Sequence, residues 1–367
     1  MTQRPRIPAP SRLFAPTRLG GLELPNRLVM APLTRNRADA AGVPGELMAT
    51  HYARRASAGL IIAEGTTPNA VGRSYPHIPG IHTSDQIAGW RRVTGAVGEA
   101  GGRMFLQLQH AGRIGHPDTS GHVPLAPSAV RFPEPLHTPT GLQDGVTPRA
   151  MTAADVEETI ADFARAARNA VEAGFAGVEV HSANGHLPHQ FLSPNTNLRT
   201  DAWGGSVERR IRFTVEVVRA TVEAIGRDRV GVRVSPGSNV NGVEEGDTEA
   251  LYAALLPALA ELEPVYLHQV RADPDHGLFT RIRATWPGTL IANPALSREE
   301  VAADGGRARG ERLLAAGADL IALGRGFVAN PDLVERLRTG APLDELRPEF
   351  LMHVHGAEGY DDHPIPA

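Results

Sequence analysis

Eight short apolar segments alternate with eight longer amphipathic segments along most of the chain. Short apolar runs of this kind are typical of strands buried in a parallel sheet, and the segments between them have helical length and periodicity. Eight strand–helix units in succession predict an α/β protein with a (β/α)8 TIM barrel, built as one domain over residues 1–367. The expected strands are residues 28–31, 60–64, 104–108, 178–181, 230–234, 265–268, 290–293 and 320–323. The expected helices are residues 44–57, 85–99, 153–172, 207–225, 248–262, 277–285, 298–315 and 331–338.

The N-terminal part of the chain departs from this alternation. Two adjacent glycines separate the short segments 17–19 and 22–24, which predicts a β-hairpin. We expect this N-terminal hairpin to cap the bottom of the barrel. Residues 1–11 are rich in Pro and Arg and are expected to be disordered or to lie on the surface.

Two long segments follow the second and third expected strands. Residues 64–85 and 109–152 are rich in Pro, Gly and His. Loops of this length are uncommon unless they are functional, and in barrels the loops after the strands carry the ligand contacts. We therefore expect a site at the C-terminal ends of the strands, with residues 109–152 forming a capping excursion after the third strand.

A doubly wound sheet is the alternative arrangement for alternating strands and helices. Such a sheet would carry a glycine-rich dinucleotide-binding turn directly after its first strand. Residues 31–34 read Ala-Pro-Leu-Thr at that position, so the barrel is favoured.

The composition excludes several kinds of chemistry. All 37 basic residues are Arg, and the absence of Lys excludes Schiff-base catalysis and the Lys-dependent phosphate loop. Cys is also absent, which excludes disulfides, thiolate nucleophiles and Cys-ligated iron–sulfur clusters. The net charge of -4 and the lack of a basic run argue against a nucleic-acid partner. No segment resembles a signal peptide or a membrane span, so we expect a soluble cytoplasmic protein.

The most informative stretch follows the fourth expected strand, where the apolar run 177–180 leads into His181, Asn184 and His186. His181 and Asn184 can donate two hydrogen bonds to one carbonyl or nitro oxygen and stabilise negative charge that develops there. His186 can give or take a proton nearby. Alternatively, these residues belong to an ordinary loop that caps the next helix, but three of them at a strand end favour a catalytic site.

Other polar residues at strand ends suit a planar ring and a phosphate. Few carboxylates converge there, so no metal site is predicted. The Gln107 amide matches an imide edge, and Arg233 would place a positive charge at the barrel centre that stabilises an anionic reduced ring. Residues 291–293 and 322–326 end the last two strands, where barrels commonly bind phosphate. A ring and a phosphate inside one barrel indicate FMN.

Several longer motifs then make the chain similar to a known family. They are residues 26–35 (NRLVMAPLTR), 55–61 (RASAGLI), 79–82 (PGIH), 191–210 (FLSPNTNLRTDAWGGSVERR), Gly324-Arg325 with 329–333 (ANPDL), and 356–360 (GAEGY). With these motifs, the chain resembles the old yellow enzyme family of FMN-dependent ene-reductases, close to the bacterial branch that reduces N-ethylmaleimide and nitrate esters. The resemblance extends over residues 13–364.

The resemblance implies a role for each matching residue. The cofactor-binding residues would be Pro32, Leu33 and Thr34 against the flavin ring, Gly65, Gln107 and Arg233 along its pyrimidine side, and Ala292, Asn293, Gly324 and Arg325 at its phosphate. The substrate-binding residues would be His181 and Asn184, which grip the electron-withdrawing group, together with Thr34, Tyr75, Gln109 and Tyr360. His181, Asn184 and His186 would be the catalytic residues.

The resemblance also implies an activity. NAD(P)H would give hydride to the flavin N5 and leave, and an alkene activated by a carbonyl or nitro group would then take the same site, in a ping-pong cycle. The expected partners are NAD(P)H and the small-molecule alkene, with neither nucleic acid nor membrane. The expected assembly is a monomer or homodimer.

Three positions depart from the family pattern. His186 stands where the family usually has a Tyr proton donor, Gln109 stands where Trp is common, and Pro294 replaces a glycine of the phosphate loop and removes one N–H donor. Because an imidazole changes charge near neutral pH and a phenol does not, we expect reduction with an altered pH dependence. The lower aromatic content implied by Gln109 suggests a bulky or polar substrate.

Alternative functions follow from the same departures. The missing Tyr leaves open a flavin-dependent isomerase or desaturase in a biosynthetic pathway, or a non-catalytic flavin-binding protein. A metal-dependent barrel hydrolase is a further rival. It would draw on His110, His116, His181, His186 and His189, but their spacing fits no ligand scheme.

Overall fold

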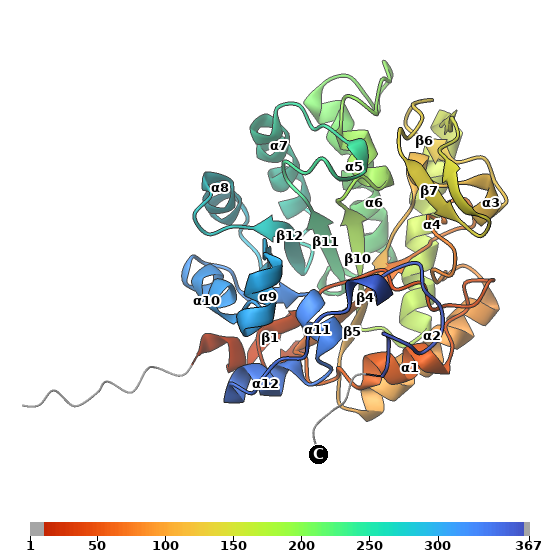
Figure 1. Cartoon of the computed structure of the whole chain (residues 1–367). Helices are drawn as coiled ribbons and strands as arrows, with labels where there is room; N and C mark the ends of the chain where they lie inside the picture. Colours follow the sequence, from red (N-terminus) through yellow and green to blue (C-terminus); the bar gives the residue numbers. More distant parts are fainter. Residues whose placement is uncertain (1–10, 363–367) are drawn as a thin grey trace, which may run out of the picture.

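Eight parallel strands form a closed barrel at the centre of the molecule (Figure 1). The structure is a computed structural model that describes residues 11–362, so the expectation for residues 1–11 lies almost wholly outside the described residues. Around the barrel, each strand lies beside the one that precedes it in the chain, and β14 closes against β3. The predicted (β/α)8 TIM barrel is confirmed. The strands are β3 (Leu28–Met30), β4 (Leu60–Thr66), β5 (Met104–Leu108), β10 (Gly177–Ser182), β11 (Val230–Val234), β12 (Tyr266–Ala272), β13 (Leu290–Pro294) and β14 (Leu320–Leu323).

Helices surround the barrel and mostly have the predicted bounds. The expected continuous helix over 298–315 is wrong, because Gly305 (φ 63°) and Gly306 (φ 92°) adopt left-handed conformations that end one helix before the next begins. The helices are α1 (Glu46–Ala53), α2 (Ser84–Glu99), α4 (Ala153–Glu172), α5 (Leu187–Leu192), α6 (Val207–Ile225), α7 (Thr248–Ala260), α8 (Gly277–Thr285), α9 (Arg298–Asp304), α10 (Arg307–Ala315), α11 (Arg325–Ala329) and α12 (Leu333–Thr339). Among residues 11–362, no helix combines the length and apolar character needed to cross a bilayer.

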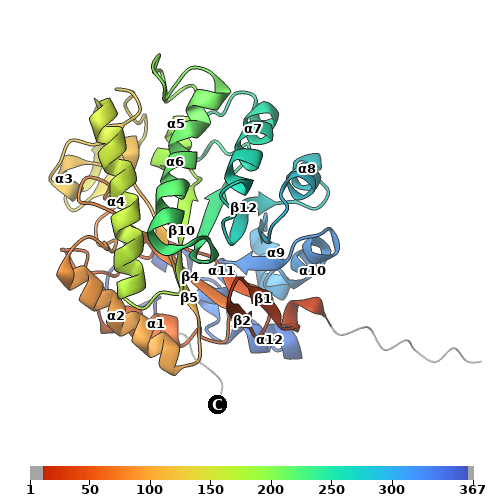
Figure 2. The ribbon, with the colours of Figure 1, turned by 180° about the vertical axis from the view of Figure 1, so that it is seen from behind.

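The N-terminal hairpin is confirmed and closes the barrel from below. It consists of β1 (Thr17–Leu19) and β2 (Leu22–Leu24), which pair antiparallel and lie in the lower half of the view from behind (Figure 2). Leu19 and Leu24 are buried in one apolar cluster with Phe105 and Tyr266 from the barrel strands. The hairpin therefore seals the end of the barrel opposite to the expected site.

The capping excursion after β5 has its own short elements. It contains α3 (Pro117–Ser120), the antiparallel hairpin of β7 (Pro135–Thr138) and β8 (Gly141–Asp144), and the parallel pair of β6 (Leu125–Ala126) and β9 (Arg149–Ala150). These elements lie beside the upper part of α4 (Figure 1). The predicted long excursion after the third barrel strand is confirmed.

The barrel interior is apolar below and polar above. Alternate residues of the strands point inward, and the lower ones include Phe105, Tyr266, Ile291 and Leu320. Gly231 provides the space for one of them, since a Cβ at this position would lie 2.1 Å from the Tyr266 ring. Two residues further along several of these strands, the inward side chains are polar, and they form the floor of the candidate site.

Candidate active site

A layer of polar side chains crosses the barrel interior above the apolar residues. Gln107, Glu179, Arg233 and His268 come from β5, β10, β11 and β12, and each is at most 5% exposed. The Gln107 amide donates from Nε2 to Glu179 Oε1 at 2.8 Å, and His268 Nδ1 lies 2.8 Å from Glu179 Oε2. These contacts fix the orientation of the Gln107 amide and leave its oxygen free to accept a hydrogen bond from a ligand.

Glu179 is the buried charge that orders this layer, and the sequence interpretation missed it. Burial acts to raise its pKa, but the facing His268 and Arg233 hold the pKa of Glu179 below its ordinary value. The carboxylate is therefore ionised at neutral pH. A signal was present in the sequence, since Glu179 precedes His181 by two residues and so shares its inward face, but it was read as part of an apolar run.

A cavity of about 550 Å³ opens at the C-terminal ends of β3, β11, β13 and β14. Its wall contains three guanidinium groups and no carboxylate, so it suits an anion. Arg233 donates to Asn293 Oδ1 at 2.9 Å, and its Nε is buried without a partner. An unpartnered buried donor and an excess of positive charge both fit FMN, which brings acceptor atoms and a phosphate. The lining residues are Ala31, Pro32, Leu33, Arg233, Arg271, Asn293, Pro294, Ala295, Leu296, Ser297, Val301, Gly305, Leu323, Gly324, Arg325 and Gly326.

The cavity brings together most of the residues predicted to bind the cofactor. Its wall includes the predicted Pro32, Leu33, Arg233, Asn293, Gly324 and Arg325. Gln107 and Gly65 are not in this wall. Thr34 and Ala292 are not in this wall; Ala292 is fully buried within β13 and Thr34 is partly exposed.

Gly65, in β4, and Gln109, directly after β5, lie against each other. A Cβ at Gly65 would lie 2.1 Å from the Gln109 side-chain oxygen, so a larger residue there would displace the Gln109 amide. The Gln109 amide donates to the Ser74 hydroxyl at 2.9 Å and is 2% exposed. Gln109 is therefore held by the protein itself in this structure.

Three imidazoles gather near the rim of the barrel. The ring centroids of His181 and His186 are 4.6 Å apart. Burial lowers the pKa of His186 to about 4 and, with the help of His186, lowers that of His110 to about 3. Burial, His186 and Arg233 together hold the pKa of His181 well below its ordinary value. All three rings are therefore neutral at pH 7, and neither nitrogen of His181 bonds to a described residue.

Asn184 sits in a strained turn directly after β10. Both Asn184 (φ 53°) and Gly185 (φ 74°) adopt left-handed conformations. The Asn184 N–H donates to Ser235 Oγ at 2.8 Å, and its carbonyl accepts from Asn241 Nδ2 at 2.8 Å. The backbone is thus fixed on both sides, while the side-chain amide of the half-buried Asn184 makes no hydrogen bond with a described residue. Backbone strain held in this way is a feature of functional sites.

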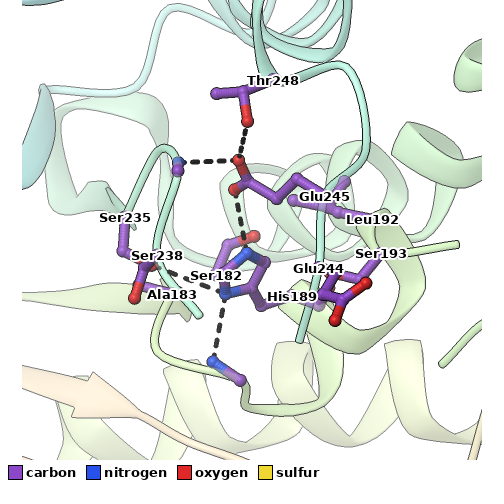
Figure 3. A network of polar contacts seen from close by, with 12 residues as sticks. Ser182, Ala183, His189, Leu192, Ser193, Ser235, Ser238, Glu244, Glu245 and Thr248 are labelled. Atoms are coloured by element: carbon purple, nitrogen blue, oxygen red, sulfur yellow. Dashed lines mark hydrogen bonds and ion pairs between the residues drawn. The ribbon is translucent and has the colours of Figure 1, made fainter. Parts of the chain in front are cut away.

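A buried pair of His189 and Glu245, shown in Figure 3, is hydrogen-bonded to the backbone of this turn. The Gly185 N–H donates to His189 Nδ1 at 3.0 Å, so the ring proton is on Nε2, which lies 2.9 Å from Glu245 Oε1. Burial acts to raise the pKa of Glu245, but its donors hold the pKa below the ordinary value. The other donors to this carboxylate are the Gly237 N–H at 2.7 Å, the Thr248 hydroxyl at 2.9 Å and the Tyr252 hydroxyl at 2.9 Å.

Replacing Glu245 with Gln should lower the free energy of unfolding at pH 7 by about 2–4 kcal/mol, because an amide leaves buried donors unpaired. The folded-state pKa of Glu245 lies below its unfolded value, so its stabilisation is complete above the unfolded pKa and is lost as pH falls through the folded pKa. The difference between wild type and Glu245→Gln should therefore shrink in acid. Urea unfolding at several pH values measures it.

Glu244→Gln is the matched control, because Glu244 is the exposed neighbour and the charge change is identical. It should leave the unfolding free energy within about 0.5 kcal/mol of wild type. Equal losses in the two variants would show that the buried network adds nothing to stability.

Three segments that are far apart in the sequence meet through a group of aromatic rings. The ring of Tyr75 lies edge-on to His353, with centroids 5.5 Å apart, and His353 stacks on His137 at 3.7 Å. These residues come from the segment after β4, the C-terminal segment and the capping excursion, respectively. The sequence interpretation named Tyr75 but missed His137 and His353. It carried no signal for them, because their contact depends on how two long loops fold across the barrel.

Tyr360 is not brought into this group. Its ring is fully buried and stacks on His51 with centroids 3.9 Å apart. The guanidinium carbons of Arg35 and Arg37 lie 4.9 and 5.0 Å from its centroid. Tyr360 does not line the 550 Å³ cavity, so its place in the substrate pocket stays a prediction.

Comparison with known proteins gives one consistent answer. Residues 12–344 match the NADH:flavin oxidoreductase / NADH oxidase family. The "Probable flavin mononucleotide-dependent alkene reductase" of Leishmania infantum is 38% identical, over 96% of this chain and 97% of that protein. The solved old yellow enzyme homologue of Zymomonas mobilis is 36% identical with a TM-score of 0.91, over 97% of this chain and 100% of that chain.

A further solved structure contains a nicotinamide analogue. Morphinone reductase in complex with tetrahydroNAD is 42% identical with a TM-score of 0.88, over 96% of this chain and 97% of that chain. On the family match, on identities above 30% over nearly whole chains and on the barrel itself, the chain belongs to the NADH:flavin oxidoreductase / NADH oxidase family and is an FMN-dependent ene-reductase of the old yellow enzyme type.

Proposed function

We propose that the protein reduces carbon–carbon double bonds conjugated to a carbonyl or nitro group, with NAD(P)H as the electron source. The observation that carries the proposal is that His181 and Asn184 both leave side-chain donors without a protein partner at the end of β10, where His181 pairs in register with Arg233 of the cavity wall. FMN, when bound, takes hydride from NAD(P)H and passes hydride to the β-carbon of the alkene. Because both substrates use one site in turn, we expect ping-pong kinetics.

His181 and Asn184 stabilise the charge that develops on the substrate oxygen. As hydride reaches the β-carbon, negative charge moves onto the carbonyl or nitro oxygen. His181 is neutral at pH 7, so it acts as a fixed N–H donor, and the Asn184 amide supplies a second donor. The turn at Asn184 and Gly185 is already held by Ser235 and His189, so the donors need little reorganisation during the reaction.

The cavity wall and the polar layer would hold FMN from several sides. Arg233 has a buried Nε without a partner and supplies positive charge at the barrel centre. Gln107 presents its amide oxygen, since its Nε2 is bonded to Glu179. Arg325 makes no ion pair with a described residue, which leaves its charge for a phosphate. We assign Pro32, Leu33, Thr34 and Gly65 to the ring, and Ala292, Asn293, Gly324 and Arg325 to the phosphate side.

Steady-state kinetics under nitrogen test this function directly. With 2-cyclohexenone and either NADPH or NADH, we expect formation of cyclohexanone and parallel lines in double-reciprocal plots. Failure to reduce both 2-cyclohexenone and a nitroalkene, with FMN fully bound, would overturn the proposal.

His186 is a poor proton donor at neutral pH in this geometry. Its Nδ1 lies 3.3 Å from the Ala183 carbonyl, so the ring proton is on Nδ1, and its buried Nε2 has no partner. With a pKa of about 4, roughly one ring in a thousand carries a second proton at pH 7. We therefore propose that water supplies the α-proton near neutral pH and that His186 contributes only in acid.

Two substitutions of His186 should separate these roles. His186→Phe should match wild type within about twofold at pH 8 and fall behind it toward pH 5, where the imidazolium becomes populated. His186→Tyr should make alkene reduction faster at pH 8, on the order of tenfold, because a phenol stays protonated there. Rates of flavin reoxidation by 2-cyclohexenone between pH 5 and 9 measure both effects. Identical pH profiles for wild type and His186→Tyr would contradict a role for His186.

Isomerisation or desaturation is a second candidate function, favoured by the neutral state of His186. A site that passes hydride but protonates slowly can return the hydrogen to another carbon. Incubation of the reduced enzyme with a β,γ-unsaturated ketone should then give the α,β-unsaturated isomer faster than the saturated product. Exclusive formation of saturated product would exclude this function.

The family assignment as an oxidoreductase speaks against a non-catalytic flavin-binding protein.

A further inference from the structure

Arg271 occupies a β-bulge at the rim of the barrel. The pairing of β12 with β13 is regular up to Val270 and Asn293, then shifts, so that Ala272 pairs with Pro294 and Arg271 is the extra residue. Its backbone has φ 54°, a left-handed conformation that is strained for a residue other than glycine. Bulges next to active sites commonly turn a side chain toward a ligand, and such strain calls for a functional explanation.

Arg271 is exposed at the rim, and its guanidinium has no protein partner. It makes no hydrogen bond or ion pair with any residue between 11 and 362. The side chain lines the 550 Å³ cavity and also an adjoining chamber of about 480 Å³. It is therefore a third cation, with Arg233 and Arg325, in a cavity wall that contains no carboxylate.

The residue opposite the bulge lacks the donor that a phosphate would use. Pro294 has no N–H, and it pairs in register with Ala272, next to Arg271. Asn293 does not replace the missing donor, because its amide oxygen accepts from Arg233 and its Nδ2 donates to the Ala322 carbonyl at 2.9 Å. On this side of the cavity, Arg271 is therefore the cation that is available to bind an anion.

We propose that Arg271 is a second cationic ligand for the FMN phosphate, opposite Arg325, in place of the backbone N–H that Pro294 removes. The proposal rests on the proposed position of the phosphate beside Arg325. A phosphate monoester is the shared chemistry of two ligands of this enzyme class, FMN and the 2′-phosphate of NADPH. The bulge next to Pro294 favours FMN, and the experiment separates the two.

The test compares FMN with riboflavin, which differs only by the phosphate. Full-length enzyme is reconstituted with either flavin, and flavin release on dilution is followed by the recovery of its fluorescence. In Arg271→Gly, FMN affinity should fall about 10- to 100-fold while riboflavin affinity stays unchanged. Without flavin, the variant should melt at the same temperature as flavin-free wild type or higher, because glycine relieves the strain at φ 54°. A loss of FMN affinity without a loss of thermal stability would show that the effect is not a folding defect.

Three further variants make the result decisive. Arg271→Gln should lose FMN affinity like Arg271→Gly, and Pro294→Gly in the Arg271→Gly background should restore part of it by supplying an N–H. Arg281→Gln is the matched control, because it removes one exposed Arg that pairs with Glu249 instead of lining the cavity. It should leave both flavin affinities unchanged.

Each other outcome overturns the proposal. Unchanged FMN affinity, or an equal loss for FMN and riboflavin, would show that Arg271 does not bind the phosphate. If the KM for NADPH rose relative to that for NADH while FMN affinity stayed unchanged, Arg271 would bind the 2′-phosphate of NADPH instead of the FMN phosphate. Arg325→Gln tests the proposed position of the phosphate itself. If this variant also kept wild-type FMN affinity, the phosphate would not lie beside Arg325.

Discussion

Replacing Arg233 with Met is expected to weaken FMN binding on the order of 100-fold. Arg233 is 5% exposed, has an unpartnered Nε and supplies charge at the barrel centre, so the loss of its guanidinium removes charge-assisted hydrogen bonds from a buried ligand. Flavin that stays bound should also have a lower two-electron reduction potential, because nearby positive charge favours added electrons. Flavin release on dilution and dye-equilibrated reduction measure the two effects.

Two variants control for the loss of a charge alone. Arg229→Met removes an exposed Arg immediately before β11, at the opposite end of the same strand, and should change neither quantity. Arg233→Lys keeps the charge but loses the planar donor set, so its effect should be intermediate. If Arg233→Met bound FMN as tightly as Arg229→Met, the proposed cofactor position would be wrong.

Replacing His181 or Asn184 with Ala should lower kcat/KM for 2-cyclohexenone by roughly 10²–10³-fold, since each removes one donor to the developing oxyanion. The double variant should lose less than the product of the two single losses, because the residues act on one oxygen. Each variant should also bind 4-hydroxybenzaldehyde more weakly, since the phenol oxygen would use the same two donors.

His122→Ala is the control for this pair, because His122 is exposed in the capping excursion and its ring makes no contact with the site. It should retain wild-type reduction and phenol binding. Unchanged phenol affinity in both His181→Ala and Asn184→Ala would refute the proposed donor pair, whatever happened to turnover.

The barrel could be predicted from the sequence because its signal is local and repeated. Each buried strand is a short apolar run, and Thr152 and Gly174 mark the ends of α4, where the structure shows a capping box at Thr152 and a left-handed glycine at φ 92°. The break between α9 and α10 was missed, although Gly305-Gly306 stood in the sequence. Glycine inside a helical pattern is often tolerated, and only the local packing decides whether the helix stops.

The candidate site was predictable where residues follow strands and not where loops meet. His181, Arg233 and Asn293 lie near the ends of strands and Arg325 follows β14 directly, so the fold alone brings them to one rim. The stacking of His353 on His137 depends on the folding of two distant segments, which no local pattern encodes. The bulge at Arg271 arises from a shift in the pairing of β12 with β13. It could not be predicted, because the sequence does not show which residues of the two strands pair.

The charge states of the site were also beyond the sequence. His186 was expected to titrate near neutral pH, as an exposed imidazole does. Burial lowers its pKa to about 4 instead, and its Nδ1 proton points to the Ala183 carbonyl. Both facts depend on the surroundings of the ring, and together they favour water over His186 as the proton source at neutral pH.

An anaerobic spectral titration tests the central claim most directly, namely that this barrel carries FMN in front of a donor pair that activates conjugated alkenes. The purified protein should be yellow, should bleach with one equivalent of NADPH or NADH per flavin, and should regain its colour when one equivalent of 2-cyclohexenone is added. The colour should return at least about 100-fold more slowly in the combined His181→Ala, Asn184→Ala variant. Folded protein that binds no added FMN, or a variant that regains colour at the wild-type rate, would contradict the account.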